Sequence, residues 1–127
     1  LGITFNAVDL IETDDPYFVG RVGVKGTRAG NFAMQNCDLL LVLGSRLPVP
    51  VSGYNYKTFA RDAKVIVVDI DKQEHSKNTV KIDKFIHSDL KDFLYNNPIS
   101  TKSKSFGYII NICIRQIITS FHNCIDH

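Results

Sequence analysis

Cysteine is scarce in this chain of 127 residues, which contains only Cys37, Cys113 and Cys124. An odd number of cysteines at irregular spacing forms neither a disulfide framework nor a zinc site. The four histidines are equally scattered, and none has a cysteine or aspartate at a zinc-ligand spacing that would make a convincing site. The sequence therefore predicts no metal centre, and Cys37 is expected to pack as a small apolar side chain.

Long apolar runs and strong charge are also missing. No run approaches the ~20 apolar residues that a membrane-spanning helix needs, and no signal-peptide pattern is present. The formal net charge is +2, which is too small to indicate a nucleic acid or an anionic membrane as partner. These absences favour a cytoplasmic globular protein with one domain and one core.

Three common functional motifs are absent as well. The chain has no Gly-x-Gly-x-x-Gly fingerprint and no P-loop. Ser45 and Ser52 lack the Gly-x-Ser-x-Gly setting of a hydrolase nucleophile. Dinucleotide binding, phosphate binding and serine catalysis therefore receive no support from their usual signatures.

Two continuous apolar runs give the clearest structural signal that is present. Leu39–Leu43 stops at Gly44, and residues 65–68 stop at Asp69. Runs without alternation are typical of strands covered on both faces in a parallel sheet. Weaker strand signals lie at residues 2–5 and 85–87, and helical segments follow several of the strands. This alternation predicts an α/β fold with a parallel sheet.

The connecting segments are read from caps and periodicity. Thr27 is expected to cap a helix that runs to about residue 36. Helical spacing predicts that Ala29, Phe32, Ala33 and Cys37 share its buried face. Asp89 is expected to open a short helix through residue 95, and residues 6–25 form a long connection.

Residues 96–127 differ in character from the rest. Residues 96–105 are polar and contain a proline, which is typical of a linker. Isoleucines in residues 106–122 would line one face of a helix, but β-branched residues are mediocre helix formers. A docking helix and a poorly ordered segment both stay open for this tail.

Three loops are expected at one edge of the sheet, because ligands of open parallel sheets bind beyond the carboxyl ends of the strands. Residues 23–28 combine glycines with the free amides of a helix start, which favour an anion such as pyrophosphate. Arg46, two residues after Gly44, can neutralise phosphate or stack on a flat ring. Asp69 and Asp71 follow the next strand and can accept hydrogen bonds from ribose hydroxyls.

Each loop also has a purely structural interpretation. In this interpretation, Gly26 and Gly44 are present simply because each allows a tight turn. Asp69 or Asp71 can cap the following helix, and Lys25 can be an ordinary solvated charge. The convergence of three loops favours a dinucleotide site more strongly than any one of them, without identifying the nucleotide.

Residues 23–46 resemble the central domain of thiamine-diphosphate-dependent enzymes of the acetolactate synthase kind. The family pattern is Gly-x-His-Gly-Thr, a helix ending in Asn-Cys-Asp-Leu-Leu, and Leu-Gly-x-Arg. This chain reads Gly-Val-Lys-Gly-Thr, Asn-Cys-Asp-Leu-Leu and Leu-Gly-Ser-Arg. Residues 59–60, 64–71 and 88–89 continue the match in register. The resemblance thus covers residues 1–95 and leaves 96–127 as a linker and a tail unlike the family.

The resemblance implies a three-layer, Rossmann-like parallel sheet of six strands, the DHS-like NAD/FAD-binding type shared with sirtuins and electron-transfer flavoproteins. It also implies a sheet that is incomplete at the N-terminus, because the opening strands and first helix should precede Leu1. A sirtuin-like, NAD-consuming enzyme shares the sheet but usually needs a four-cysteine zinc site, which three cysteines cannot supply.

In acetolactate synthases this domain holds FAD in a structural role. The positions assigned to FAD by the resemblance, with Gly26 added from the loop analysis, form one candidate set: Gly23, Val24, Lys25, Gly26, Gly44, Ser45, Arg46, Asp69, Ile70 and Asp89. Three departures from the family suit a relative that binds FAD weakly or not at all. Lys25 replaces a histidine, residues 47–50 replace an Asp-Asp-Arg stretch, and Ser88 replaces a glycine.

No catalytic or metal-binding residue is expected in this chain. The family's catalytic glutamate and its Gly-Asp-Gly…Asn motif, which binds magnesium and the diphosphate, belong to two other domains. The resemblance therefore implies a non-catalytic fragment of a thiamine-diphosphate-dependent transferase or lyase that acts on 2-oxo acids, with a homodimeric or homotetrameric parent. A free-standing module that binds FAD, NAD or ADP and an inactive truncated gene product stay open as alternatives.

Overall fold

A computed structural model describes residues 1–97 and 108–112. Its strands are β1 Gly2–Ile3, β2 Gly20–Arg21, β3 Leu39–Leu43, β4 Lys64–Asp69, β5 Lys84–His87 and β6 Tyr108–Ile112. Its α-helices are α1 Arg28–Gln35, α2 Val49–Ser52 and α3 Leu90–Asn96, and its short 3₁₀ helices are η1 Phe5–Ala7, η2 Tyr56–Thr58 and η3 Glu74–Ser76.

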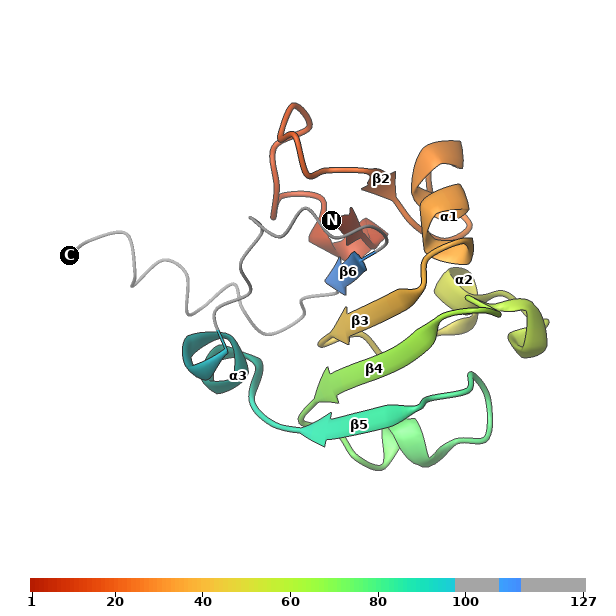
Figure 1. Cartoon of the computed structure of the whole chain (residues 1–127), viewed down its shortest axis with the longest axis vertical. Coiled ribbons are helices and arrows are strands. Elements are labelled where there is room, and N and C mark those ends of the chain that lie inside the picture. The colour runs from red at the N-terminus through yellow and green to blue at the C-terminus, as the bar shows by residue number, and fades with distance from the viewer. Residues whose placement is uncertain (98–107, 113–127) are drawn as a thin grey trace.

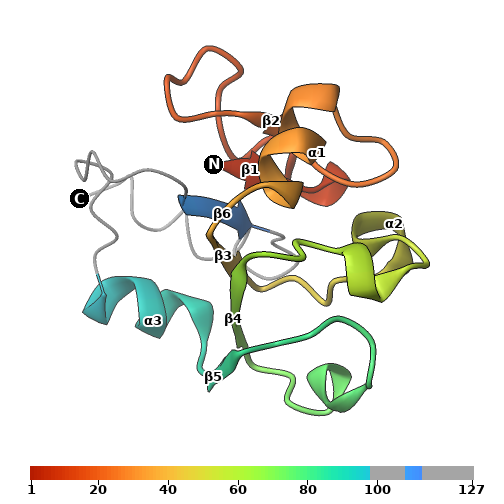
Figure 2. The ribbon, with the colours of Figure 1, turned by 45° about the vertical axis from the view of Figure 1, so that its right-hand side comes forward.

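The six strands form one sheet in the order β2-β1-β6-β3-β4-β5, and every neighbouring pair is parallel (Figure 1). Figure 2 shows α1 and α2 on one face of the sheet and α3 on the other. These three layers confirm the predicted Rossmann-like α/β fold with a parallel sheet.

The two apolar runs are strands β3 and β4, as predicted, and they pair in register from Leu39 with Lys64 to Leu43 with Val68. Alternate residues of both strands, such as Leu40 and Val67, are fully buried in the core under α1. The remaining residues face the other side, where Leu39 and Leu41 are half-buried. The strands are therefore apolar on both faces, although only one face is completely covered.

Cys37 belongs to this core, as its residue type predicted. It is buried after α1, and its thiol donates a hydrogen bond to the carbonyl oxygen of Met34 at 3.2 Å. Burial raises the pKa of the Cys37 thiol above its ordinary value, because the core disfavours the thiolate. Cys37 is thus an inert packing residue rather than a nucleophile.

Helix α1 begins where the sequence predicted, with the Thr27 hydroxyl oxygen accepting a hydrogen bond from the Gly30 amide at 3.1 Å. The predicted buried face was wrong in part. Phe32 is 69% exposed and Ala29 is also exposed, whereas Gly30 and Met34 are buried. The helix is rotated toward Gly30 because that residue lies against the backbone of Arg21, which leaves no room for a side chain.

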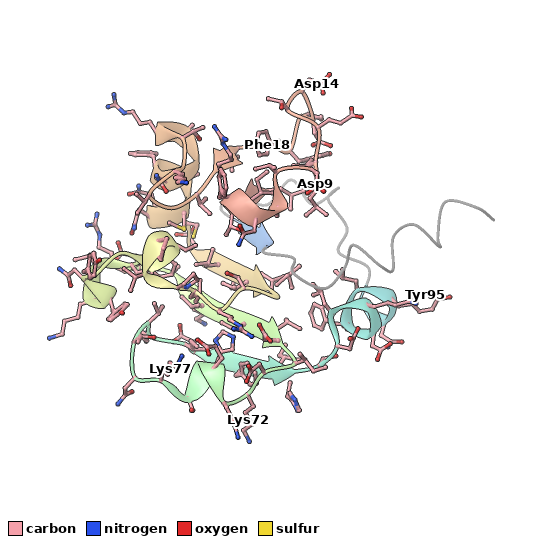
Figure 3. All side chains as sticks on the ribbon, turned by 180° about the vertical axis from the view of Figure 1, so that it is seen from behind. Asp9, Asp14, Phe18, Lys72, Lys77 and Tyr95 are labelled. Atoms are coloured by element: carbon pink, nitrogen blue, oxygen red, sulfur yellow. The ribbon has the colours of Figure 1, made fainter. Side chains whose placement is uncertain are left out.

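A strand that the sequence did not reveal lies in the long connection from η1 to α1. Gly20–Arg21 forms β2, which is two residues long and, among the described strands, pairs only with β1. Figure 3 shows the preceding loop, with Asp9, Asp14 and Phe18, standing away from the sheet. A strand of two residues is too short to carry a periodic signal.

The tail contributes a central strand, which corrects the helix considered for residues 106–122. Tyr108–Ile112 forms β6 between β1 and β3, with Gly2 opposite Asn111 and Leu39 opposite Tyr108. β-branched side chains suit a pleated strand better than a helix, and the sheet offers partners on both sides. Residues 113–122 of that segment lie outside the described residues.

Candidate functional site

The carboxyl ends of β1 to β5 lie at one edge of the sheet, because all neighbouring strands are parallel. The turns that contain Gly26, Gly44 and Asp69 follow or end β2, β3 and β4. The prediction that these turns share one edge is therefore confirmed. We call the loops that follow β1 to β5 the carboxyl edge.

The first of the predicted loops is closed by hydrogen bonds within the protein. The Gly23 amide donates to the Asn31 side-chain oxygen at 2.7 Å, and the Asn31 side-chain nitrogen donates to the Gly23 carbonyl at 2.9 Å. The Val24 amide donates to the Pro50 carbonyl at 2.7 Å, and the Gly26 amide to the Gly23 carbonyl at 2.8 Å. These three amides are thus already bonded within the protein.

What this loop presents to solvent is its side chains. Val24 is 79% exposed. The Lys25 ammonium lies 4.6 Å from the centre of the Phe5 ring, which follows β1 and is half-exposed. A cation over an aromatic face is an attractive contact. The contact joins the loops after β1 and β2 into one surface that is both apolar and positively charged.

The loop after β3 combines a tight turn with an exposed cation. Gly44 has a φ of 61°, in the left-handed region that favours glycine, and its amide donates to the Val68 carbonyl at 2.9 Å. Ser45 is fully buried, and its hydroxyl oxygen accepts a long hydrogen bond from the Leu47 amide at 3.4 Å. Arg46 extends into solvent beside these buried groups.

The two aspartates after β4 have different surroundings. The Asp69 side chain is buried, with Oδ2 3.3 Å from His75 Nε2 and Oδ1 accepting a hydrogen bond from the Asp71 amide at 2.8 Å. Asp71 is more exposed, and its Oδ2 lies 3.9 Å from Arg46 Nη2. Asp71 Oδ1 also accepts amide hydrogen bonds from Gln73 and Glu74. The carboxylate available to a ligand at this edge is therefore Asp71, and Asp69 points into the protein.

The negative charge beside Arg46 is also stabilised locally. The hydrogen bond from Lys77 lowers the pKa of Glu74, and the charge of Arg46 contributes in the same direction. Ile70, between the two aspartates, is half-exposed. The middle of the carboxyl edge thus carries an exposed cation, an ionised acid and an apolar side chain.

The loop after β5 connects to that of β4 but has a structural role of its own. His87 Nε2 lies 2.8 Å from the Ile70 carbonyl oxygen, and the Ser88 amide donates to the Asp69 carbonyl at 3.2 Å. The Asp89 carboxylate accepts a hydrogen bond from the Lys91 amide at 2.8 Å and caps α3. Asp89 thus has the capping role that the sequence predicted for it, at the outermost strand.

Thr4 is a residue at this edge that sequence reasoning missed. It follows β1 directly and is 3% exposed, yet its hydroxyl has no hydrogen-bond partner among the described residues. A buried polar group without a partner is uncommon and points to a missing ligand or water. The sequence signal was a threonine at the end of a short apolar run, but the run was interpreted as one strand through residue 5.

These features define an open, doubly wound α/β domain whose loops meet at the edge where such folds bind nucleotides. Residues 2–96 match the family described as "Thiamine pyrophosphate enzyme, central domain". The chain belongs to this family, and the resemblance seen in residues 23–46 is confirmed.

Similarity to individual proteins agrees with this assignment. The chain is 45% identical over 74 residues to acetolactate synthase isozyme 2 large subunit of Escherichia coli (strain K12), covering 58% of this chain and 13% of that protein. It is 42% identical over 81 residues to the probable acetolactate synthase large subunit of Methanocaldococcus jannaschii, covering 64% of this chain and 13% of that protein. A probable acetolactate synthase large subunit of Methanococcus aeolicus is 36% identical over 101 residues, covering 80% of this chain and 16% of the relative.

The chain therefore spans only a small part of the length of these relatives. Among the described residues, no helix is long and apolar enough to cross a membrane. No group of three or more histidine, cysteine, aspartate or glutamate side chains in residues 1–97 is arranged to hold a metal ion.

Proposed function

We propose that this chain supplies the central, nucleotide-binding-type domain of a thiamine-diphosphate-dependent enzyme that acts on 2-oxo acids, as acetolactate synthases do. The observation that carries the proposal is the family match over residues 2–96, together with five loops along a single sheet edge in which each loop contacts its neighbour. In this proposal the chain holds a nucleotide and leaves the carbon–carbon chemistry to other domains of its parent.

FAD is the cofactor that we propose for the carboxyl edge, bound more weakly than in acetolactate synthases because Lys25, residues 47–50 and Ser88 depart from the family. Arg46 would meet the phosphates, because a guanidinium forms charge-assisted hydrogen bonds with them. Asp71 would accept from ribose hydroxyls. Phe5 and Val24 offer exposed apolar surface for a flat ring, and the unpartnered hydroxyl of Thr4 offers a buried polar contact.

The candidate residues would contribute in different ways. Lys25, Arg46 and Ile70 present side chains to solvent at this edge, whereas Gly23, Gly26 and Gly44 shape the turns that hold those side chains. Ser45, Asp69 and Asp89 hold the loops from within through their own hydrogen bonds. We propose direct FAD contacts only for the first group, together with Phe5, Val24, Asp71 and Thr4.

Replacing Arg46 by alanine is expected to weaken FAD binding about tenfold or more, since a charge-assisted hydrogen bond contributes about 1.5–3 kcal/mol. The measurement is isothermal titration with FAD, NAD and ADP, supported by quenching of flavin fluorescence. Arg61→Ala is the matched control. The Arg61 side chain is 62% exposed against 57% for Arg46, and Arg61 precedes β4 at the opposite edge.

The control variant should bind FAD as the unmodified chain does. Absence of saturable binding of all three nucleotides would remove the nucleotide proposal. Equal weakening by Arg46→Ala and Arg61→Ala would remove the carboxyl edge as its place.

The proposal also predicts that this chain alone does not turn over pyruvate. With thiamine diphosphate and magnesium added, acetolactate formation should stay at the level of a blank without protein. The thiamine diphosphate, the magnesium ion and the subunit contacts of a dimeric or tetrameric parent would belong to other domains. Turnover that rises in proportion to the concentration of this chain would contradict the non-catalytic role.

A free-standing nucleotide-binding module is the second candidate. One observation favours it, because the tail strand β6 gives this chain a sheet of six strands without help from another domain. Both candidates predict that this chain binds nucleotide alone, so the titration described above does not separate them. Sequencing the coding DNA on either side of this chain does. The first candidate expects it to encode the domains with the catalytic glutamate and the Gly-Asp-Gly motif, and the second candidate expects neither.

A further inference from the structure

The centre of the sheet is filled from the far end of the described chain. β6 pairs with β3 over five residues, from Leu39 with Tyr108 to Leu43 with Ile112. It pairs with β1 over two residues, Gly2 with Asn111 and Ile3 with Ile112. Within residues 1–97 and 108–112, the sheet halves β2-β1 and β3-β4-β5 are joined by hydrogen-bonded strands only through β6. We call the position between β1 and β3 the β1/β3 slot.

The strand in the slot does not come from the part of the chain that matches the family. Residues 2–96 include every described strand except β6. The usual order of a doubly wound sheet is 3-2-1-4-5-6, in which the first strand of the chain is central. Here that central place is taken by the last described strand. The slot is thus built by family residues and filled by a segment from outside them.

The β1/β3 slot can accept a strand without requiring a particular sequence. The backbone groups of β1 and β3 form the hydrogen bonds of a parallel ladder, which any extended segment can satisfy. The neighbouring side chains Ile3, Leu40 and Val42 are buried and apolar. Three of the five residues in Tyr108–Ile112 are isoleucines, a residue type that suits such a strand.

The connection that leads to the slot is long. Eleven residues, 97–107, join α3 to β6, and fully extended they reach about 40 Å at most. A short hairpin would bind a strand to its own neighbour, but a connection of this length can equally deliver the strand to another molecule. A second copy brings a matching strand together with a matching slot.

We propose that the β1/β3 slot is a strand-exchange surface through which two copies of this chain associate, each inserting Tyr108–Ile112 into the other. The exchanged dimer forms the same strand pairs as the closed monomer. Protein concentration and the length of the connection therefore determine which of the two states is populated. A linker of about ten residues corresponds to an effective concentration on the order of millimolar. The chain is therefore monomeric at micromolar concentration and exchanges when it refolds near millimolar concentration. The inference concerns the middle of the sheet and is independent of nucleotide binding at its edge.

Shortening the connection is the first test. Deletion of residues 98–106 leaves two linking residues, which reach about 7 Å. The path from the helix layer on β4 to the slot beside β3 requires about 10 Å sideways and about 10 Å in depth. The shortened chain should therefore elute with twice the monomer mass in light scattering at all concentrations. Asn111→Pro in the shortened chain should abolish this dimer. A folded, monomeric shortened chain would overturn the proposal.

A second test uses the full-length connection and does not depend on the folding of the shortened chain. In a background of Cys37→Ala, Cys113→Ser and Cys124→Ser, one chain carries Val42→Cys and another carries Asn111→Cys, two positions that face each other in register. The two are refolded together near millimolar concentration and oxidised. A disulfide-linked heterodimer on a non-reducing gel is expected.

The control places both cysteines on one chain and refolds it at micromolar concentration, where a disulfide within the monomer should form. If that control forms its bond and the mixed chains give no heterodimer, exchange between copies is overturned.

Discussion

Asn111→Pro is expected to lower the melting temperature of this chain by roughly 10 °C or more, which corresponds to a few kcal/mol for a small domain. Asn111 lies opposite Gly2 on β1 and Val42 on β3, so its strand is paired on both sides. Proline cannot donate to the ladder and is excluded from central strands. The change removes the backbone N–H of residue 111 and leaves a carbonyl oxygen of the neighbouring strand without its donor. Among the described strands, β6 is the only one that links β2-β1 to β3-β4-β5.

The size of the expected effect follows from what β6 covers. A buried backbone group left without a partner costs about 1–3 kcal/mol. When the strand leaves the slot, the edges of β1 and β3 are opened to water, including the regions around Leu40 and Val42, which are now 0% exposed. Native domains are stable by only about 5–15 kcal/mol, so the loss of one central strand removes a large share of that stability.

Thermal unfolding followed by circular dichroism measures this change, and hydrogen exchange locates it. The amides of β3 should lose protection more than those of β5, whose one partner in the described part of the sheet is β4. Asn111→Ala is the matched control, because it changes the same side chain and keeps the amide donor. Equal melting temperatures for Asn111→Pro and Asn111→Ala would show that β6 contributes no ladder hydrogen bonds at this position.

The elements that the sequence predicted correctly are those whose signal is local and strong. β3 and β4 follow from apolar runs that end at Gly44 and Asp69, and α1 follows from its Thr27 cap. The parallel sheet then places the loops at one edge by topology alone. These features need no knowledge of distant contacts, because each depends on residues within one element.

The features that the sequence did not reveal depend on contacts between distant segments. Isoleucines at 109, 110 and 112 fit a strand or a mediocre helix, and the pairing with β1 and β3 decides between them. Asp69 and Asp71 are equivalent in sequence, but His75 lies beside Asp69 and Arg46 beside Asp71. The partner of each carboxylate, and hence its direction, is set by the fold.

Gly30→Ala is expected to destabilise the chain by about 1–3 kcal/mol, the cost of inserting an atom into a packed site. In an exposed helix the same exchange stabilises by about 1 kcal/mol, because alanine is the better helix former. A methyl group at Gly30 would lie 2.3 Å from the carbonyl oxygen of Arg21 and 2.9 Å from the carbonyl carbon of Gly20. Both atoms belong to the backbone, so no side-chain rotation relieves the contact.

The helix must therefore move away from β2, and its cap moves with it. The Gly30 amide is the donor to the Thr27 hydroxyl, and Thr27 ends the loop that carries Val24 and Lys25. A shift of α1 thus displaces two side chains proposed to face the nucleotide. We expect Gly30→Ala to weaken FAD binding as well as folding, whereas Arg46→Ala should weaken binding only.

Denaturant titration with and without FAD measures both effects, and two variants serve as controls. Ala29→Gly, one residue earlier on the exposed side of α1, should destabilise by about 1 kcal/mol through helix propensity alone. Gly53→Ala tests a glycine with φ 76° and ψ 177° and no atom within 4 Å of its added methyl group, so it should cost about 1–3 kcal/mol from backbone strain. The stability lost in Gly30→Ala, by contrast, depends on the close contact between α1 and β2. A more stable Gly30→Ala chain would mean that the helix and strand do not approach as closely as the fold requires.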